Sequence, residues 1–121
     1  MSYRYYSSQR PVSPGSFPKP VGNGVLEIVN FDRRTPCYDA NCDAWGYIEY
    51  EKPLGKELAR CYELVKQKYP LYIKCGEYIG RFQYEESRGI PVYRFPGGDR
   101  VASSGEIEHG SNDRQELEAR L

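Results

Sequence analysis

Four cysteines and one histidine are the residues of this 121-residue chain best suited to chemistry, and their spacing limits what they can do. Cys37 and Cys42 are separated by four residues, a loop spacing that zinc knuckles use. The second half of such a site is missing, because Cys61 and Cys75 are far apart and the only histidine is His109. The sequence therefore favours reduced thiols over a structural metal, and no cofactor is expected.

Catalysis has one weak candidate. Cys75 could act as a nucleophile with His109 as its base, and Glu106 and Glu108 lie beside that histidine in the sequence. No pattern in the sequence brings the thiol and the imidazole together, and the chain has neither a phosphate loop nor a G-x-S-x-G motif. We therefore expect a protein that is not an enzyme.

Aromatic and basic residues are interleaved in the C-terminal half. Single-stranded nucleic acids are bound on such surfaces, where bases stack on rings and cations follow the backbone. Residues 70–104 carry five basic and four acidic side chains, and this net charge of +1 is low for an autonomous RNA binder. A Tyr- and Arg-rich surface also suits a protein partner. The residues expected to contact a partner are Tyr78, Tyr84, Glu85, Glu86, Tyr93, Arg94, Asp99, Arg100, Glu106 and Glu108.

The charge and the N-terminus suggest a soluble protein. The chain has 17 basic and 17 acidic side chains, so no global field attracts it to nucleic acid. The opening MSYRYYSSQR lacks the apolar run of a signal peptide, and no stretch is long and apolar enough for a membrane span. We expect a cytoplasmic protein without membrane contacts.

The N-terminal half is organised around Trp45–Tyr50, whose aromatic and β-branched residues are typical of a half-buried strand. From Leu54 to Tyr69, apolar residues spaced three and four apart predict a helix that Pro70 ends. The expected elements before Trp45 are a strand over Tyr3–Ser7, a proline-rich connection over Pro11–Gly24 that crosses the sheet and buries Phe17, a central strand over Val25–Phe31 and a loop over Asp32–Asp43.

The C-terminal half predicts short strands joined by glycine-containing turns. A hairpin is expected around a Cys75-Gly76 turn, followed by a strand over Ile90–Phe95. The fold class is therefore α+β: a small antiparallel sheet with one packed helix (β-β-β-α), followed by a β-meander or partial barrel. The expected divisions are residues 1–69 for the first part, 70–109 for the second and 110–121 for a polar tail.

Several short N-terminal motifs together carry a family resemblance. They are YRYY with QRP, FPKP, WGYIEY, and then PL and YELV, within residues 1–66. This stretch resembles a module of accessory proteins from conjugative elements and phages of Gram-positive bacteria. It is similar to the N-terminal domain shared by several type II-A anti-CRISPR proteins.

The resemblance implies a non-enzymatic inhibitor of a type II RNA-guided nuclease in the bacterial host cell, acting on guide RNA assembly or nucleic-acid binding. Such a nuclease has a positive guide-binding channel, which carboxylates can occupy as phosphate mimics. The candidate mimics are Glu77, Glu85, Glu86, Asp99, Glu106 and Glu108. Three alternatives stay open. One is a direct guide-RNA binder using Tyr84, Tyr93, Arg81, Arg94 and Arg100. Another is a ribonuclease or cofactor-dependent enzyme that acts on the guide, and the last is an element-encoded adaptor with an unrelated protein partner.

Overall fold

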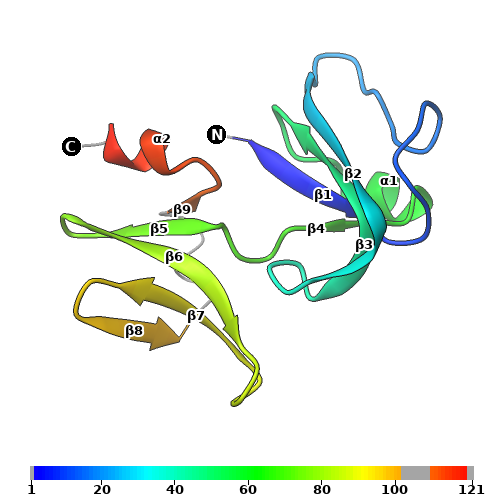
Figure 1. The fold of residues 1–121 in the computed structure, drawn as a ribbon. Helices are drawn as coiled ribbons and strands as arrows, with labels where there is room; N and C mark the ends of the chain where they lie inside the picture. The colour runs from blue at the N-terminus through cyan, green and yellow to red at the C-terminus, as the bar shows by residue number, and fades with distance from the viewer. Residues whose placement is uncertain (1, 102–109, 120–121) are drawn as a thin grey trace. The chain divides into compact units, whose positions relative to one another are not determined.

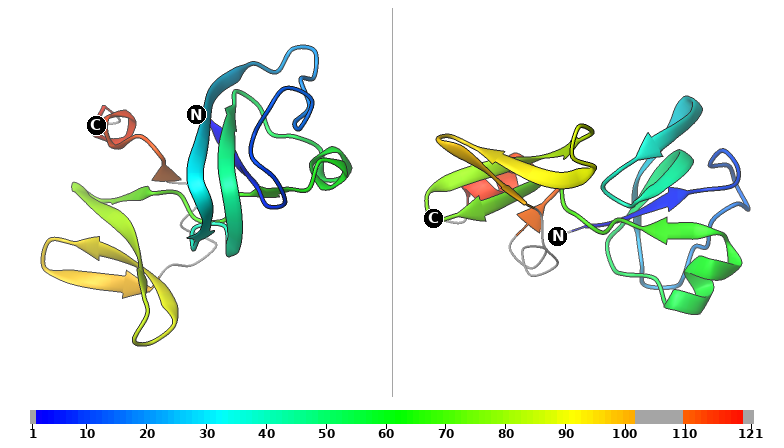
Figure 2. Two further views of the ribbon diagram at one scale, coloured as in Figure 1. Left: turned by 45° about the vertical axis from the view of Figure 1, so that its right-hand side comes forward. Right: turned by 90° about the horizontal axis from the view of Figure 1, so that it is seen from below.

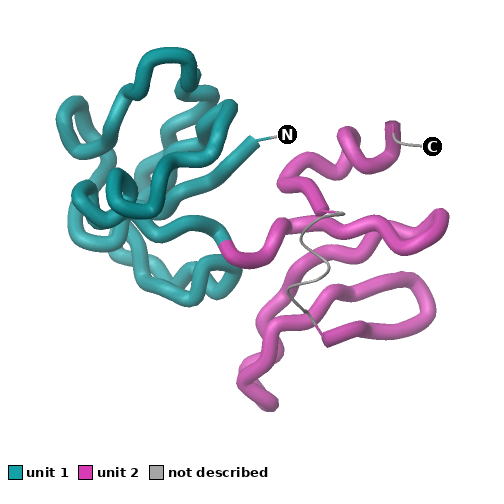
Figure 3. The backbone as a smooth tube through the Cα atoms, turned by 180° about the vertical axis from the view of Figure 1, so that it is seen from behind, with its two compact units in different colours: residues 1–67 teal, residues 68–121 magenta. Residues whose placement is uncertain are grey.

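The computed structural model describes residues 2–101 and 110–119 and is predominantly β (Figure 1). The described residues form nine strands in two antiparallel sheets, with two helices of six and five residues. The expected α+β class with a β-β-β-α unit is therefore wrong. The chain divides into two compact units, residues 1–67 and residues 68–121 (Figure 3).

The first unit contains a four-stranded sheet in the order β2-β3-β1-β4. β1 and β3 are central, and their side chains supply much of the core, including Tyr5, Ile48 and Tyr50. The elements are β1 (Tyr3–Ser7), β2 (Val25–Cys37), β3 (Cys42–Tyr50), α1 (Lys56–Cys61) and β4 (Leu64–Lys66).

The long helix predicted over Leu54–Tyr69 is replaced by one short helix and a strand. α1 ends at Cys61, and Glu63 then adopts a left-handed backbone with φ of 56°. The chain turns there, so that Leu64–Lys66 pairs with β1 as strand β4. The apolar spacing matches a helical stripe. Residues 64–66 instead pair with the free edge of β1, which gives hydrogen-bond partners to backbone N–H and C=O groups that the end of a helix would leave without any.

The assignments of β2 were also wrong. The segment predicted as a central strand lies at the edge of the sheet, where Leu26 and Ile28 are exposed. The predicted loop over Asp32–Asp43 continues β2 as far as Cys37, which pairs with Cys42 across a four-residue turn. An edge strand can carry apolar residues on both faces without being buried, so composition alone did not place it.

The proline-rich connection crosses the first sheet and completes its core, as predicted. Phe17 and Val12 are buried in the same cluster as Tyr50. The Tyr50 hydroxyl donates to the carbonyl of Pro18 at 2.8 Å. The Asn30 amide fixes the start of the crossing, because its Oδ1 accepts from the Val12 N–H at 2.7 Å and its Nδ2 donates to the Val12 carbonyl at 2.9 Å.

The second unit is a five-stranded antiparallel sheet in the order β8-β7-β6-β5-β9 (Figure 2). Four consecutive strands form a meander, and β9 pairs with the outer side of β5. The predicted strand Ile90–Phe95 is confirmed as β7, whereas the first turn is Gly76-Glu77, one residue later than predicted. The elements are β5 (Tyr72–Cys75), β6 (Tyr78–Glu85), β7 (Ile90–Phe95), β8 (Gly98–Val101), β9 (Gly110–Ser111) and α2 (Arg114–Glu118).

An aromatic cluster lies on one face of this sheet, and Val92 is buried on the other face. Ile73 and Tyr93 are buried, and Phe82 packs edge-on against Tyr93 with ring centroids 5.6 Å apart. Tyr69 stacks on the other side of Phe82 at 5.7 Å. The residues before β5 therefore cover the aromatic face of the meander.

Candidate functional site

Two hairpin turns meet at one end of the second sheet and enclose a shallow pocket. The β5–β6 and β7–β8 turns lie at the same end of the sheet, because β5 and β7 run in the same direction and each turn follows the end of its strand (Figure 1). The pocket has a volume of about 310 Å³. We call it the hairpin pocket. Its lining residues are Cys75, Tyr78, Phe95, Pro96, Gly97, Gly98, Asp99 and Arg100.

The floor of the hairpin pocket depends on a glycine. A Cβ atom built on Gly80 would lie 2.5 Å from two ring carbons of Phe95, so only glycine leaves room for the ring. On the β7–β8 turn, Gly97 has φ of 93°, a left-handed conformation that glycine adopts without a steric cost. Both glycines therefore serve the shape of this site.

Aromatic and cationic groups share the hairpin pocket. Tyr78 is 52% exposed. The Arg100 guanidinium carbon lies 5.9 Å from the Phe95 ring centroid, and Nη1 donates to the Cys75 sulfur at 3.2 Å. Rings beside a guanidinium suit an apolar or flat group that carries a negative charge.

Asp99 is the acidic residue of the hairpin pocket and belongs to a chain of side-chain contacts. Its carboxylate forms an ion pair with Arg94 Nη1 at 3.4 Å, and Arg94 Nε donates to Gln83. These contacts hold Arg94 between β6 and β8. The structure thus brings together the predicted residues Tyr78, Asp99 and Arg100, with Arg94 beside them.

Three other predicted contact residues lie at the opposite end of the sheet. Tyr84, Glu85 and Glu86 belong to the β6–β7 hairpin end, where Arg88 donates to Glu85 at 2.5 Å. That hydrogen bond holds the pKa of Glu85 below its usual value, with smaller contributions from the charges of Arg88 and Arg94. These residues do not line the hairpin pocket.

Tyr93 belongs to the core and is not available to a partner. It is 0% exposed, and its hydroxyl donates to the carbonyl of Pro70 at 2.7 Å. Its burial argues against the predicted contact role, because Phe82 packs on its ring and Pro70 accepts from its hydroxyl. Glu106 and Glu108, with the histidine beside them, lie outside the described residues.

Sequence reasoning did not assign Phe95, Cys75 or Gly97 to this site. The sequence predicts Phe95 only as the end of a strand and Cys75 only as a turn residue and a candidate nucleophile. The available signal was topological: alternate turns of a meander lie at the same end of the sheet, so the residues beside its first and third turns gather there. Finding these residues required the strand register, and the register predicted from the sequence was wrong by one residue at the first turn.

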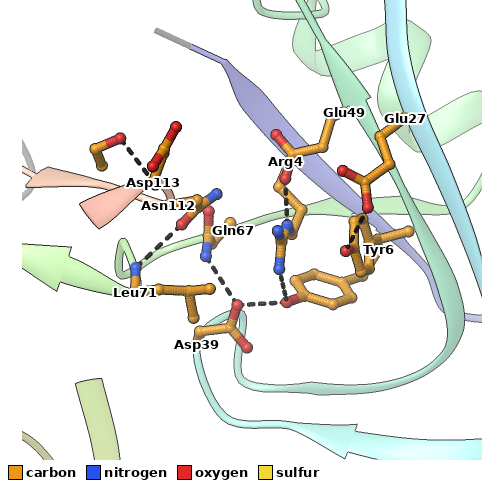
Figure 4. A network of polar contacts seen from close by, with 11 residues as sticks. Arg4, Tyr6, Glu27, Asp39, Glu49, Gln67, Leu71, Asn112 and Asp113 are labelled. Atoms are coloured by element: carbon orange, nitrogen blue, oxygen red, sulfur yellow. Dashed lines mark hydrogen bonds and ion pairs between the residues drawn. The ribbon is translucent and has the colours of Figure 1, made fainter. Parts of the chain in front are cut away.

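The first unit contains a polar network that fixes the β2–β3 turn (Figure 4). Arg4 Nε donates to Glu49 at 2.5 Å, and its Nη1 lies 3.5 Å from the Tyr6 hydroxyl. Tyr6 in turn donates to Asp39 Oδ2, which also accepts from Gln67 Nε2 at 2.9 Å. Asp39 belongs to the four-residue turn, so the network anchors that turn to β1.

The protonation states in this network follow from burial and charge. Burial opposes ionisation of Tyr6, and the negative charge of Asp39 adds to it, so the Tyr6 pKa is well above its usual value. Burial alone would lower the Arg4 pKa, but hydrogen bonds and charges from Tyr6 and Glu49 outweigh it and raise the pKa. Arg4 therefore stays charged and Tyr6 stays a donor, as a structural network requires.

No group of three or more His, Cys, Asp or Glu side chains within residues 2–101 and 110–119 is arranged to hold a metal ion. The four cysteines are free thiols, with Cys37 buried and Cys42 half-buried. Neither of the helices in the described part of the chain has the length and apolar character needed to cross a bilayer.

The geometry defines a predominantly β protein with a compact N-terminal unit and a second unit that carries an aromatic, cationic pocket. Residues 1–68 match the family described as defence against restriction A C-terminal. The match covers more than half of the chain, so the protein belongs to this family, a domain of phage and mobile-element accessory proteins. No curated protein and no solved structure matches the chain. The resemblance to mobile-element accessory proteins is confirmed, and its anti-CRISPR part stays a prediction.

Proposed function

We propose that this protein is a non-enzymatic inhibitor, carried by a mobile element, that binds a type II RNA-guided nuclease and interferes with guide RNA assembly. The family match over residues 1–68 carries the proposal, because the family's description names a defence against restriction. An RNA-guided nuclease belongs to the same broad class of host defence, since it also attacks invading nucleic acid. Among host defence systems, the resemblance of the N-terminal motifs to anti-CRISPR proteins favours a type II RNA-guided nuclease as the target.

The hairpin pocket is the proposed contact surface. Tyr78 and Phe95 offer apolar area, and Arg100 offers a guanidinium, the residue types that dominate binding energy at protein interfaces. Glu77 stands exposed in the neighbouring β5–β6 turn, and Asp99 lines the pocket. The carboxylates of Glu77 and Asp99 can face the basic guide channel of the nuclease. The Tyr78 ring and the Arg100 guanidinium would then contact the nuclease surface beside that channel.

The decisive experiment varies the order of addition. Purified inhibitor is added to the nuclease before or after its guide RNA, and guide loading and DNA cleavage are measured in both cases. We expect strong inhibition only with early addition, because a surface that competes with the guide cannot enter an occupied channel. Equal inhibition with late addition would move the target to a later step, and no inhibition in either order would remove the proposal.

One observation favours a second candidate, a protein that binds the guide RNA directly. Arg81 and Arg94 are directly paired across β6 and β7, and both are exposed. Like charges in this position repel each other, and the Asp99 carboxylate compensates Arg94 in part, through the ion pair at 3.4 Å. An RNA phosphate beside Arg81 would supply a further anion. The protein's zero net charge favours the first candidate.

A gel-shift titration separates the two candidates. If the second is right, free guide RNA shifts at low salt, and Arg81→Gln weakens the shift and lowers its salt dependence. Arg114→Gln is the matched control, because Arg114 is also exposed and pairs within α2, with Glu118 at 3.0 Å. Retention on immobilised nuclease without any RNA shift supports the first candidate.

A further inference from the structure

Two free thiols face each other across the β2–β3 hairpin. Cys37 and Cys42 are directly paired residues at the end of the ladder, next to the four-residue turn. Their side chains pack in one apolar cluster with Tyr6, Ala40 and Ala44. Cys42 is also close enough to Cys37 for its charge to add to the effects that raise the Cys37 pKa.

The backbone of this pair already meets the requirements of a disulfide. Directly opposed residues of an antiparallel ladder have Cα atoms about 4.5–5.5 Å apart. Disulfides bridge Cα atoms about 4.4–6.8 Å apart. The two Cβ atoms also point to the same face, since the residues are opposed in register. The register is therefore compatible with a disulfide between the two residues.

We infer that Cys37 and Cys42 form a thiol modification site, in which a low-molecular-weight disulfide oxidises the pair to a cross-strand disulfide. One protein thiolate attacks a sulfur of the small disulfide, which gives a mixed disulfide and releases one small thiolate. The second protein thiolate then attacks the protein sulfur of the mixed disulfide and releases the other small thiolate. The pair loses two protons and two electrons, and the small disulfide is reduced to two thiols.

The order of the two attacks follows from exposure. Cys42 is half-buried and Cys37 buried, so the oxidant reaches Cys42 first and Cys37 resolves the mixed disulfide. Burial raises the pKa of Cys37 to about 12, with Asp39, Cys42 and Asp43 adding and Arg4 opposing. Burial also raises the pKa of Cys42, where the two aspartates add and Arg34 opposes. The exchange is therefore slow at neutral pH and accelerates as pH rises.

The disulfide would fix a turn that already has a structural role. The turn carries Asp39, which accepts hydrogen bonds from Tyr6 and Gln67. Closing the turn covalently holds this carboxylate in place and removes freedom from the unfolded chain. Oxidation should thus stabilise the family-matched unit, and this effect stands independently of the proposed inhibitor function.

The test uses a Cys61→Ser/Cys75→Ser background, which removes the two exposed thiols. Oxidised glutathione is added to folded protein at pH 8, and intact mass and peptide mapping follow the products. We expect loss of two hydrogen atoms, a peptide linking Cys37 to Cys42, and a rise of several degrees in the thermal midpoint that dithiothreitol reverses. In the single variant Cys37→Ser, a mixed disulfide should accumulate on Cys42, whereas in Cys42→Ser the buried Cys37 should react much more slowly.

Two results would overturn the inference. One is a stable mixed disulfide on both thiols of the folded protein, with no crosslink at pH 8 or 9. The other is a crosslink that forms only in denaturant, which would mean that the folded strands hold the sulfurs apart. The wild-type chain is mapped in parallel, so that a folding defect in the serine background leaves the test intact.

Discussion

The Phe95 ring lies against the backbone of Gly80, so closely that a Cβ atom on the glycine would stand 2.5 Å from the ring. This contact joins the core of the second unit to the hairpin pocket, because Phe95 packs against the buried cluster and also lines the pocket. A side chain at position 80 must push the ring towards the pocket. The sheet's stability and the shape of the site are thus linked through one glycine.

Gly80→Ala should therefore lower the free energy of unfolding by about 1–3 kcal/mol, the cost of overpacking a filled core. Urea denaturation measures this loss. Gly55→Ala is the control, because nothing lies within 4 Å of a Cβ atom there. The double variant Gly80→Ala/Phe95→Leu should recover part of the loss. A neutral Gly80→Ala would mean that the ring moves freely.

Local patterns predicted some elements correctly without any knowledge of their partners. The strand Ile90–Phe95 and the burial of Phe17 followed from β-branched residues, prolines and turn glycines. The region after Leu54 failed because its three-and-four spacing fits either a helix or a short helix followed by a strand. The choice depended on the free edge of β1, about 60 residues earlier in the chain, which no local pattern contains.

The candidate site was predicted in part for the same reason. Alternation correctly placed Tyr78 and Phe82 on one face of β6, but alternation does not tell whether the rest of the chain covers that face. Which face is covered depends on Tyr69 and the residues that follow it, which fold back over Phe82 and Tyr93. Tyr93 was therefore assigned to the surface, whereas its neighbours in space make it core.

Asn30 should contribute more to stability than its exposed position suggests. Its amide makes two hydrogen bonds to the Val12 backbone and so fixes the start of the proline-rich crossing. Asn30→Ala should lower the free energy of unfolding by about 1–3 kcal/mol, and limited proteolysis should cut within residues 11–20 sooner. Gln9→Ala is the control, since Gln9 is exposed and its amide contacts only Ser8, at 3.4 Å. Equal stability of the two variants would contradict this role.

Tyr50 should make the protein sensitive to alkaline pH. Burial raises its pKa to about 12, so the folded state holds this proton more tightly than the unfolded chain, whose tyrosines titrate near pH ~10. The contribution to stability is complete below pH ~10 and is lost as pH rises towards ~12, a loss of about 2–3 kcal/mol. Urea denaturation from pH 8 to 11.5 measures it.

Tyr50→Phe should reduce the slope of the free energy of unfolding against alkaline pH by the equivalent of about one proton, because residue 50 then has no phenol to titrate. It also loses the hydrogen bond to Pro18, at a cost of about 1 kcal/mol at neutral pH. Burial raises the pKa of Cys37 to about 12 as well, so both proteins are compared in a Cys37→Ala background. An unchanged slope would assign the alkaline loss to other groups.

Tyr78 and Arg100 should carry the binding energy of the hairpin pocket. Tyr78→Ala removes the most accessible ring, and Arg100→Gln removes the guanidinium beside Phe95. Each change should weaken nuclease binding by about 1–2 kcal/mol, or roughly 5- to 30-fold in Kd, as truncation of an interface anchor does. Calorimetric titration of the nuclease with each variant measures the change directly.

Matched controls make this prediction sharp. Tyr38→Ala removes a similarly exposed tyrosine from the first unit, and Arg114→Gln removes an exposed arginine that pairs with Glu118. Both should bind the nuclease as tightly as wild type. Tyr93→Ala is unsuitable, because it would create a core cavity and its effect would report unfolding. If Tyr78→Ala and Arg100→Gln keep their thermal midpoints and still bind like the controls, the contact surface lies outside the hairpin pocket.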